Sequence, residues 1–164
     1  MNEQGFLSGV HVPDLGLGAG IALWSFRACA RGGAKCCTLV RGFERTFGED
    51  GPVALAGVLD FARSLGNDGR RGILLAMPGC ARVTADELSI VACLSSAQAR
   101  DCALCDAHLS WLYAGPPPQN LSDTVFEIAD HFSTYGLQIT SPNIELRGTP
   151  SPGRKLTIVA AGNA

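Results

Sequence analysis

Apolar residues recur every three or four positions along most of this chain, the spacing of an α-helix with one buried face. In the first half, this pattern predicts helices over residues 18–31 and 34–47, and a third from Asp50-Gly51-Pro52 to Gly66. Proline suits the first turn of that third helix, where a backbone N–H would have no intrahelical partner. The glycine pair at 32–33 separates the first two helices, because glycine disfavours the helix interior.

In the second half of the chain, helix signals are stronger. Thr84 and Glu87 have the spacing of a capping box, which starts a helix by satisfying two free backbone amides. Helical sequence continues to about Tyr113, either as one long helix or as two helices that meet near Asp101. The proline run at 116–118 ends it. A last amphipathic helix follows, for which we expect Asn120 as the N-cap and Gly136 as the C-terminal stop.

Three segments do not fit a helix. The apolar run at 72–77 is a strand or a buried connector, and residues 156–160 read as a strand. Residues 1–17 contain Pro13 and several glycines and predict an irregular lead-in. The glycines at 16–20 share part of a dinucleotide-binding fingerprint. However, no strand pattern precedes them and no suitable acid follows near Val40, so we interpret them as an entry loop.

Together these elements predict a mainly α fold, a helical bundle of about five or six helices with at most one or two short strands. Residues 1–140 would form the helical domain, and residues 141–164 a Pro/Gly-rich C-terminal tail with a short strand-like segment. A chain of 164 residues is long enough for one domain with a core of its own. Its composition, 46% hydrophobic and 17% charged, is that of a globular protein.

The net charge and the N-terminal sequence argue against several classes of protein. The net charge of −2 argues against general binding to nucleic acid or to an anionic membrane. The uncharged run at 15–26 is too short to span a bilayer. The first residues lack the cationic stretch of an export signal, so we predict a cytoplasmic protein. In that compartment the seven cysteines would be reduced thiols.

The sharpest local motif is Cys102-Ala-Leu-Cys105 followed by His108. Thiolate and imidazole are ligands that zinc prefers, but a structural zinc site needs a second pair of ligands and the sequence has no second motif of this kind. The alternative is that Cys93, Cys102 and Cys105 are buried, reduced thiols of the core, and this is the interpretation we favour. We predict no cofactor.

The same Cys-x-x-Cys spacing also occurs in thioredoxin-like redox motifs. Such a motif needs its first cysteine at a helix N-terminus, after a strand, where the helix dipole lowers the pKa of the thiol. The helical pattern around Cys102 predicts instead that the pair lies well inside helical sequence. The sequence therefore argues against a redox role.

A second candidate site is basic. Arg27, Arg31 and Lys35 would lie on one side if the first two helices formed one continuous rod. Such a stripe would suit an acidic protein partner. A row of charges is more often a solvated helix face, and Gly32-Gly33 interrupts the rod.

The sequence contains none of the common hydrolase, metalloprotease, kinase or phosphate-loop motifs. We therefore predict a small cytosolic, non-catalytic protein that acts by protein–protein interaction in a regulatory or accessory role. Broad apolar helix faces further predict a homodimer; the aromatic residues on them are Trp24, Phe26, Phe126, Phe132 and Tyr135. The alternative is a metal- or ligand-binding helical protein, which could be an enzyme, that uses Cys102, Cys105 and His108.

Overall fold

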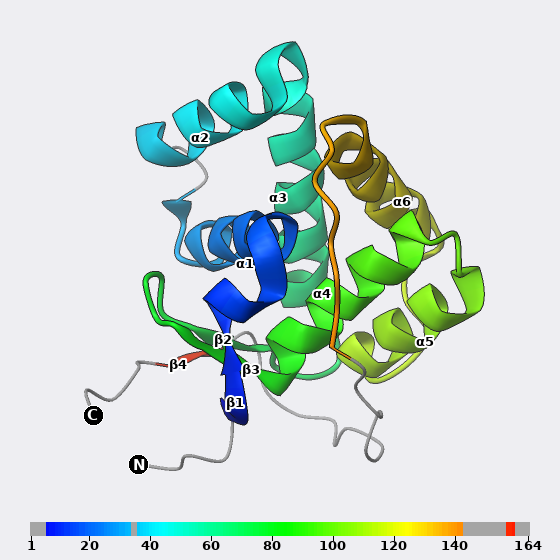
Figure 1. Ribbon diagram of the computed structural model, residues 1–164. Coiled ribbons are helices and arrows are strands. Elements are labelled where there is room, and N and C mark those ends of the chain that lie inside the picture. Colours follow the sequence, from blue (N-terminus) through cyan, green and yellow to red (C-terminus); the bar gives the residue numbers. More distant parts are fainter. Residues whose placement is uncertain (1–5, 34–35, 143–156, 160–164) are drawn as a thin grey trace.

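The computed structural model describes residues 6–33, 36–142 and 157–159 (Figure 1). It contains six α-helices, which are α1 (Gly16–Ala30), α2 (Cys37–Phe47), α3 (Gly51–Asn67), α4 (Ala85–Gln98), α5 (Cys102–Tyr113) and α6 (Gln119–Thr134). Two short 3-10 turns, η2 (Val12–Leu15) and η4 (Gly48–Asp50), precede α1 and α3. The mainly α class is therefore confirmed.

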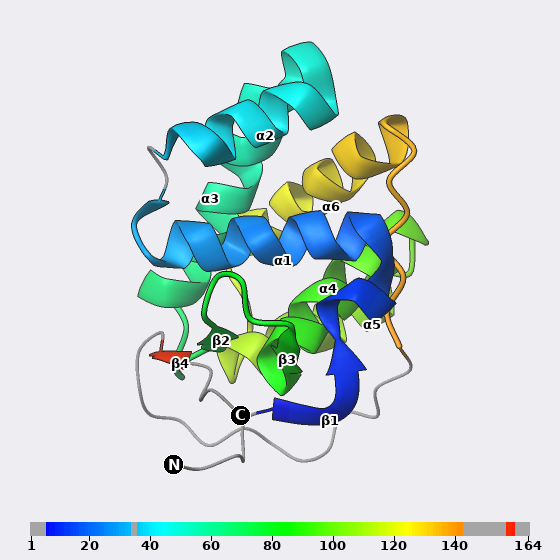
Figure 2. The ribbon, with the colours of Figure 1, turned by 60° about the vertical axis from the view of Figure 1, so that its left-hand side comes forward.

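Four short strands form two two-stranded sheets in the described part of the chain. Strands β1 (Phe6–His11) and β3 (Arg82–Thr84) pair antiparallel, and β2 (Leu74–Ala76) and β4 (Thr157–Val159) pair in parallel. Both sheets lie at the end of the molecule opposite α2 (Figure 2). Four strands exceed the one or two predicted, because each pair joins segments that are far apart in the sequence.

The lead-in was predicted wrongly. Residues 6–11 form a strand because β3, some seventy residues later, supplies the partner for the backbone hydrogen bonds. The glycine-rich segment at 16–20 is the first turn of α1 and not an entry loop. Of the predicted tail, Thr157–Val159 forms β4 beside β2, while residues 143–156 and 160–164 lie outside the described residues.

The helix boundaries follow local signals in most places. The capping box is present, since Glu87 N donates to Thr84 Oγ1 at 3.1 Å and Thr84 N donates to Glu87 Oε2 at 2.9 Å. Asp101 separates α4 from α5, and its side chain accepts from Leu104 N at 3.0 Å. Gly136 has the positive φ, 70°, that a helix end favours. Asn120 is not the N-cap of α6, because Pro118 takes that place.

The helices enclose one hydrophobic core that is rich in phenylalanine. Phe26 of α1 packs edge-on against Phe61 of α3, with ring centroids 5.0 Å apart. Phe47, at the end of α2, contacts Phe43 and also Phe132 of α6 at similar distances. These aromatic contacts connect helices from both halves of the chain. None of the helices in the described residues is long and apolar enough to cross a bilayer.

The stretch after α6 runs along α1 and α4 (Figure 1). The side chain of Gln98 in α4 holds it by donating to Leu137 O at 2.9 Å and accepting from Ile139 N at 2.8 Å. Gly18 of α1 lies so close to this stretch that a Cβ atom there would collide with the carbonyl of Gln138. Gly18 is therefore required for close packing.

We expect Gly18→Ala to destabilise the protein by about 1–3 kcal/mol, because the added methyl group pushes the 137–140 stretch away from α1. Gly66→Ala is the matched control. Gly66 is also helical and has no atom within 4 Å of an added Cβ. That substitution should leave stability unchanged or raise it by up to about 1 kcal/mol. Urea unfolding of both variants measures the difference, and equal midpoints would contradict the packing argument.

Candidate functional site

An apolar groove runs along the outer side of α1. Seven residues line a hollow of about 460 Å³, and none of the seven is charged; they are Val12, Pro13, Gly16, Leu17, Gly20, Ile21 and Trp24. Leu17 is 71% exposed, although it is a large aliphatic side chain. An apolar hollow beside an exposed leucine is a candidate site for binding another molecule.

Helical spacing explains why the groove exists. Positions 17, 20, 21 and 24 fall on one side of α1, and the buried residues Ala19, Ala22, Leu23 and Phe26 fall on the opposite side. The inner side packs on the core. The outer side is also apolar, and the chain covers it only in part: Ile21 and Trp24 are half-buried, whereas Leu17 is exposed. Thus α1 is apolar on two faces, of which one is buried and the other only partly covered.

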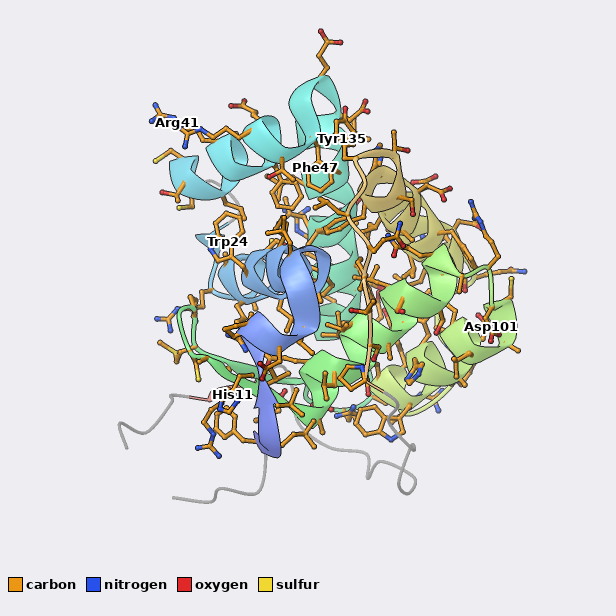
Figure 3. The ribbon with its side chains drawn as sticks, viewed as in Figure 1. His11, Trp24, Arg41, Phe47, Asp101 and Tyr135 are labelled. Atoms are coloured by element: carbon orange, nitrogen blue, oxygen red, sulfur yellow. The ribbon has the colours of Figure 1, made fainter. Side chains whose placement is uncertain are left out.

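Two features of the backbone shape the groove. Gly16 and Gly20 place no side chain on its floor, which leaves the hollow beside Leu17. At the far end, the indole ring of Trp24 lies against Gly42 of α2, so closely that a Cβ at Gly42 would come within 2.8 Å of it. Figure 3 shows Trp24 between α1 and α2. Trp24, the last residue that lines the groove, is therefore in contact with α2.

Charges lie at the two ends of the groove. Asp14 and His11 are exposed just before α1, with Asp14 Oδ2 and His11 Nδ1 3.6 Å apart. Arg41 is exposed on α2 at the other end, beyond Trp24 (Figure 3). The groove thus has an end that carries a carboxylate and an end that carries a guanidinium group.

The predicted basic stripe does not form one surface. Arg27 is only 3% exposed, and its guanidinium group makes two hydrogen bonds to the carboxylate of Glu87, at 2.6 and 2.9 Å. It also donates to the carbonyls of Cys80 and Arg82. All of these hydrogen-bond acceptors belong to the same chain. Arg27 is therefore a structural residue and is not available to an acidic partner.

The other two residues of the stripe separate from Arg27 because α1 ends at Ala30. Arg31 is exposed and donates to Met77 Sδ at 2.6 Å. Lys35 lies outside the described residues. The turn after α1 breaks the continuous rod on which the stripe depended.

A second buried ion pair lies beside the first. Arg71 donates to both carboxylate oxygens of Asp86, at 2.7 and 3.0 Å, and its guanidinium group lies 4.2 Å from the ring centroid of Trp111. Asp86 also accepts from Leu74 N at 2.6 Å. Asp86 and Glu87 are neighbours in the first turn of α4, so two consecutive carboxylates there bind two arginines. The capping box signalled the carboxylates, but nothing local signalled their arginine partners.

The predicted metal ligands do not come together. Cys102 is exposed on the surface, whereas Cys105 and His108 are buried. Burial lowers the pKa of His108 and favours its neutral form. Its Nδ1 has no hydrogen-bond partner among the described residues. In the described part of the chain, no group of three His, Cys, Asp or Glu residues is arranged to hold a metal ion.

The thiols differ from the prediction at one position. Cys93 and Cys105 are buried, as expected, and their sulfur atoms lie 3.6 Å apart. Cys102 was expected to be buried but is exposed, because α5 begins at this residue instead of continuing from α4. All seven cysteines of the chain are free thiols.

We expect Arg27→Met to lower the free energy of unfolding by about 3–5 kcal/mol, since it leaves the Glu87 carboxylate buried without its counter-charge. Chemical denaturation followed by circular dichroism measures this loss. Arg63→Met is the control, because the Arg63–Asp60 pair is exposed and spans 3.5 Å. It should cost less than about 1 kcal/mol. Similar losses in both variants would show that burial of the Arg27 pair is unimportant.

The described residues thus offer three features with functional potential. These are the apolar groove on α1, the buried arginine–carboxylate pairs and the cysteines of α4 and α5. The arginine pairs connect elements of the fold and have no access to solvent, which leaves the groove and the cysteines. Comparison with protein-family models, with curated proteins and with solved structures found no significant match to this chain.

Proposed function

We propose that this protein is non-catalytic and acts by protein–protein contact, in a regulatory or accessory role, through the apolar groove on α1. The partner that we propose is a second copy of the chain, which makes the active form a homodimer. The observation that carries this proposal is the exposed Leu17 beside an uncharged hollow of about 460 Å³. Water contact with such a surface is unfavourable, and association removes it.

The shape of the groove favours a second copy over an unrelated partner. Leu17 projects from the same face on which Gly16 and Gly20 leave room for a side chain. In a two-fold dimer each surface patch meets itself, so a projection and a hollow side by side are complementary. Leu17 of each copy would enter the hollow of the other, with Ile21 and Trp24 beside it.

The charges at the groove ends fit the same arrangement. A two-fold axis across α1 would set the two helices antiparallel. The Asp14 end of one copy would then approach the Arg41 end of the other, so that opposite charges meet at the rim. The residues that line the groove carry no positive charge, so the groove itself has no group that would bind an acidic partner.

The residues that support dimerisation differ from those first considered. Phe26 is fully buried within its own chain and contributes no surface. Phe126 is half-buried, with the Arg100 guanidinium group 5.6 Å from its ring centroid. Of the aromatic residues first considered, Trp24 is the one that lines the groove.

We further propose that the protein works in the cytoplasm. Seven free thiols fit a reducing compartment, where disulfides are rare. The alternative function, metal binding by Cys102, Cys105 and His108, has less support, because these side chains occupy different environments.

The dimer hypothesis predicts that wild-type protein sediments as a dimer at micromolar concentration and that Leu17→Asp is a monomer. An aspartate inside an apolar interface should raise the dissociation constant about a hundredfold or more. Because Leu17 is exposed, the substitution should not alter the fold of the monomer. Analytical ultracentrifugation over a concentration series measures the constant.

Val53→Asp provides the matched control. Val53 is another exposed aliphatic residue, 60% accessible, on α3 and outside the groove. The Val53→Asp substitution adds the same charge as Leu17→Asp but should leave the dissociation constant of the dimer unchanged. A monomeric wild-type protein at 100 µM, roughly a hundredfold above the micromolar range, would refute the proposal, as would equal weakening by both variants.

A further inference from the structure

We propose that Cys102, Cys105 and Cys93 form a thiol–disulfide exchange site that converts small external disulfides to thiols and ends in a buried Cys93–Cys105 disulfide. The oxidant is a low-molecular-weight disulfide of the glutathione type. This inference does not depend on the dimer or on the groove. It rests on the placement of three cysteines on α4 and α5, the exposed one at the surface and the other two in the core.

The two buried cysteines are close enough to be joined. Cys93 Sγ and Cys105 Sγ lie 3.6 Å apart, and a disulfide has a sulfur–sulfur distance of about 2.0 Å. Side-chain rotation and a small helix shift cover the difference of about 1.6 Å. No other side chain needs to move from between them, since the two sulfur atoms are already in contact.

Neither buried sulfur can meet an external disulfide directly, because both side chains are fully inaccessible. Cys102 can, since it is exposed as the first residue of α5. It lies one helical turn before Cys105. Residues three apart in an α-helix have Cα atoms about 5 Å apart, which is within the range that a disulfide spans. Cys102 therefore connects the surface to the buried pair.

This arrangement removes one of the two arguments against a redox role, since Cys102 begins α5, although the element before it is α4 and not a strand. A redox Cys-x-x-Cys motif needs its first cysteine at a helix N-terminus, and Asp101 is the N-cap of α5 directly before Cys102. The third cysteine, Cys93, comes from the neighbouring helix.

The pKa shifts of the buried pair favour Cys105 over Cys93 as the first of the two to attack. A hydrogen bond from the thiol of Cys93 lowers the pKa of Cys105, although burial opposes this effect. Burial raises the pKa of Cys93 and keeps it protonated. Cys105 is therefore the better nucleophile of the pair, because the thiolate is the form that attacks a disulfide.

The reaction proceeds in three balanced exchanges. The Cys102 thiolate attacks the external disulfide RSSR, which gives a Cys102–SR mixed disulfide and releases RS⁻. The Cys105 thiolate then attacks Cys102 Sγ, forms Cys102–Cys105 and releases the second RS⁻. Finally the Cys93 thiol passes its proton to Cys102 as its sulfur attacks Cys105 Sγ, so that the Cys102–Cys105 bond breaks and Cys102 leaves as a thiol. Two electrons pass from the protein to RSSR, and RSSR becomes two RSH after protonation.

The test uses the full-length, reduced protein and oxidised glutathione. Samples are quenched with acid at intervals, the remaining thiols are alkylated, and the protein is digested with trypsin without reduction. Cleavage after Arg82, Arg100 and Arg147 places Cys93 on one peptide and Cys102 with Cys105 on the next. We expect mass spectrometry to detect these two peptides joined by a disulfide, with a transient Cys102–glutathione adduct before it.

Cys102→Ser is the decisive variant, and it should fold because the residue is exposed. In this variant the disulfide between the two peptides can join only Cys93 to Cys105. It should still form, but about tenfold more slowly, because the buried thiols react only after local opening of the fold. Cys36→Ser is the matched control: it removes another exposed cysteine at the start of a helix, α2, and should leave the rate unchanged. Circular dichroism checks that both variants are folded.

Two results would overturn the proposal. One is the absence of any link between the two peptides after prolonged oxidation of folded wild-type protein. The other is an equal rate of linking in wild-type protein and Cys102→Ser, which would show that Cys102 is not the point of entry.

Discussion

The structure depends most on one buried carboxylate, that of Glu87. It closes the capping box with Thr84 at the start of α4, binds the guanidinium group of Arg27 in α1, and accepts from Ala76 N of β2 at 2.9 Å. One side chain thus fixes the relative positions of α1, α4 and the strands. A charge this deeply buried is tolerated only when its hydrogen-bonding capacity is filled. The position of α1, and with it the groove, follows from this contact.

The apolar groove follows from a helix that has two apolar sides. The side of α1 that carries Phe26 packs on the core, and Gly18 lets the 137–140 stretch pass close to it. Once α1 is fixed in this way, the side with Leu17, Ile21 and Trp24 necessarily points outward. The Arg27–Glu87 hydrogen bonds tie α1 to α4 in this orientation, in which Leu17 is exposed and Ile21 and Trp24 are partly buried. The dimer that we propose would remove this outer side from water.

The cysteines illustrate how a helix boundary determines chemistry. If α4 and α5 were one helix, Cys102 would lie in its middle, and Cys93 would be more than two turns away from Cys105 along the same rod. The break at Asp101 folds α5 back against α4. That single turn exposes Cys102 and brings Cys93 and Cys105 into contact. Accessibility and proximity of the thiols are both consequences of the break.

The sequence by itself determined the features that depend on nearby residues. The helical repeats, the Thr84–Glu87 capping box, the glycine stop at 136 and the burial of Cys93 and Cys105 all follow from local spacing and propensity. Tertiary structure decided the rest. The β1 strand needed a partner some seventy residues away, and Arg27 became buried because Glu87 lies sixty residues further on. Hydrogen bonds and ion pairs between distant segments leave no periodic trace in the sequence, so only the folded chain reveals them.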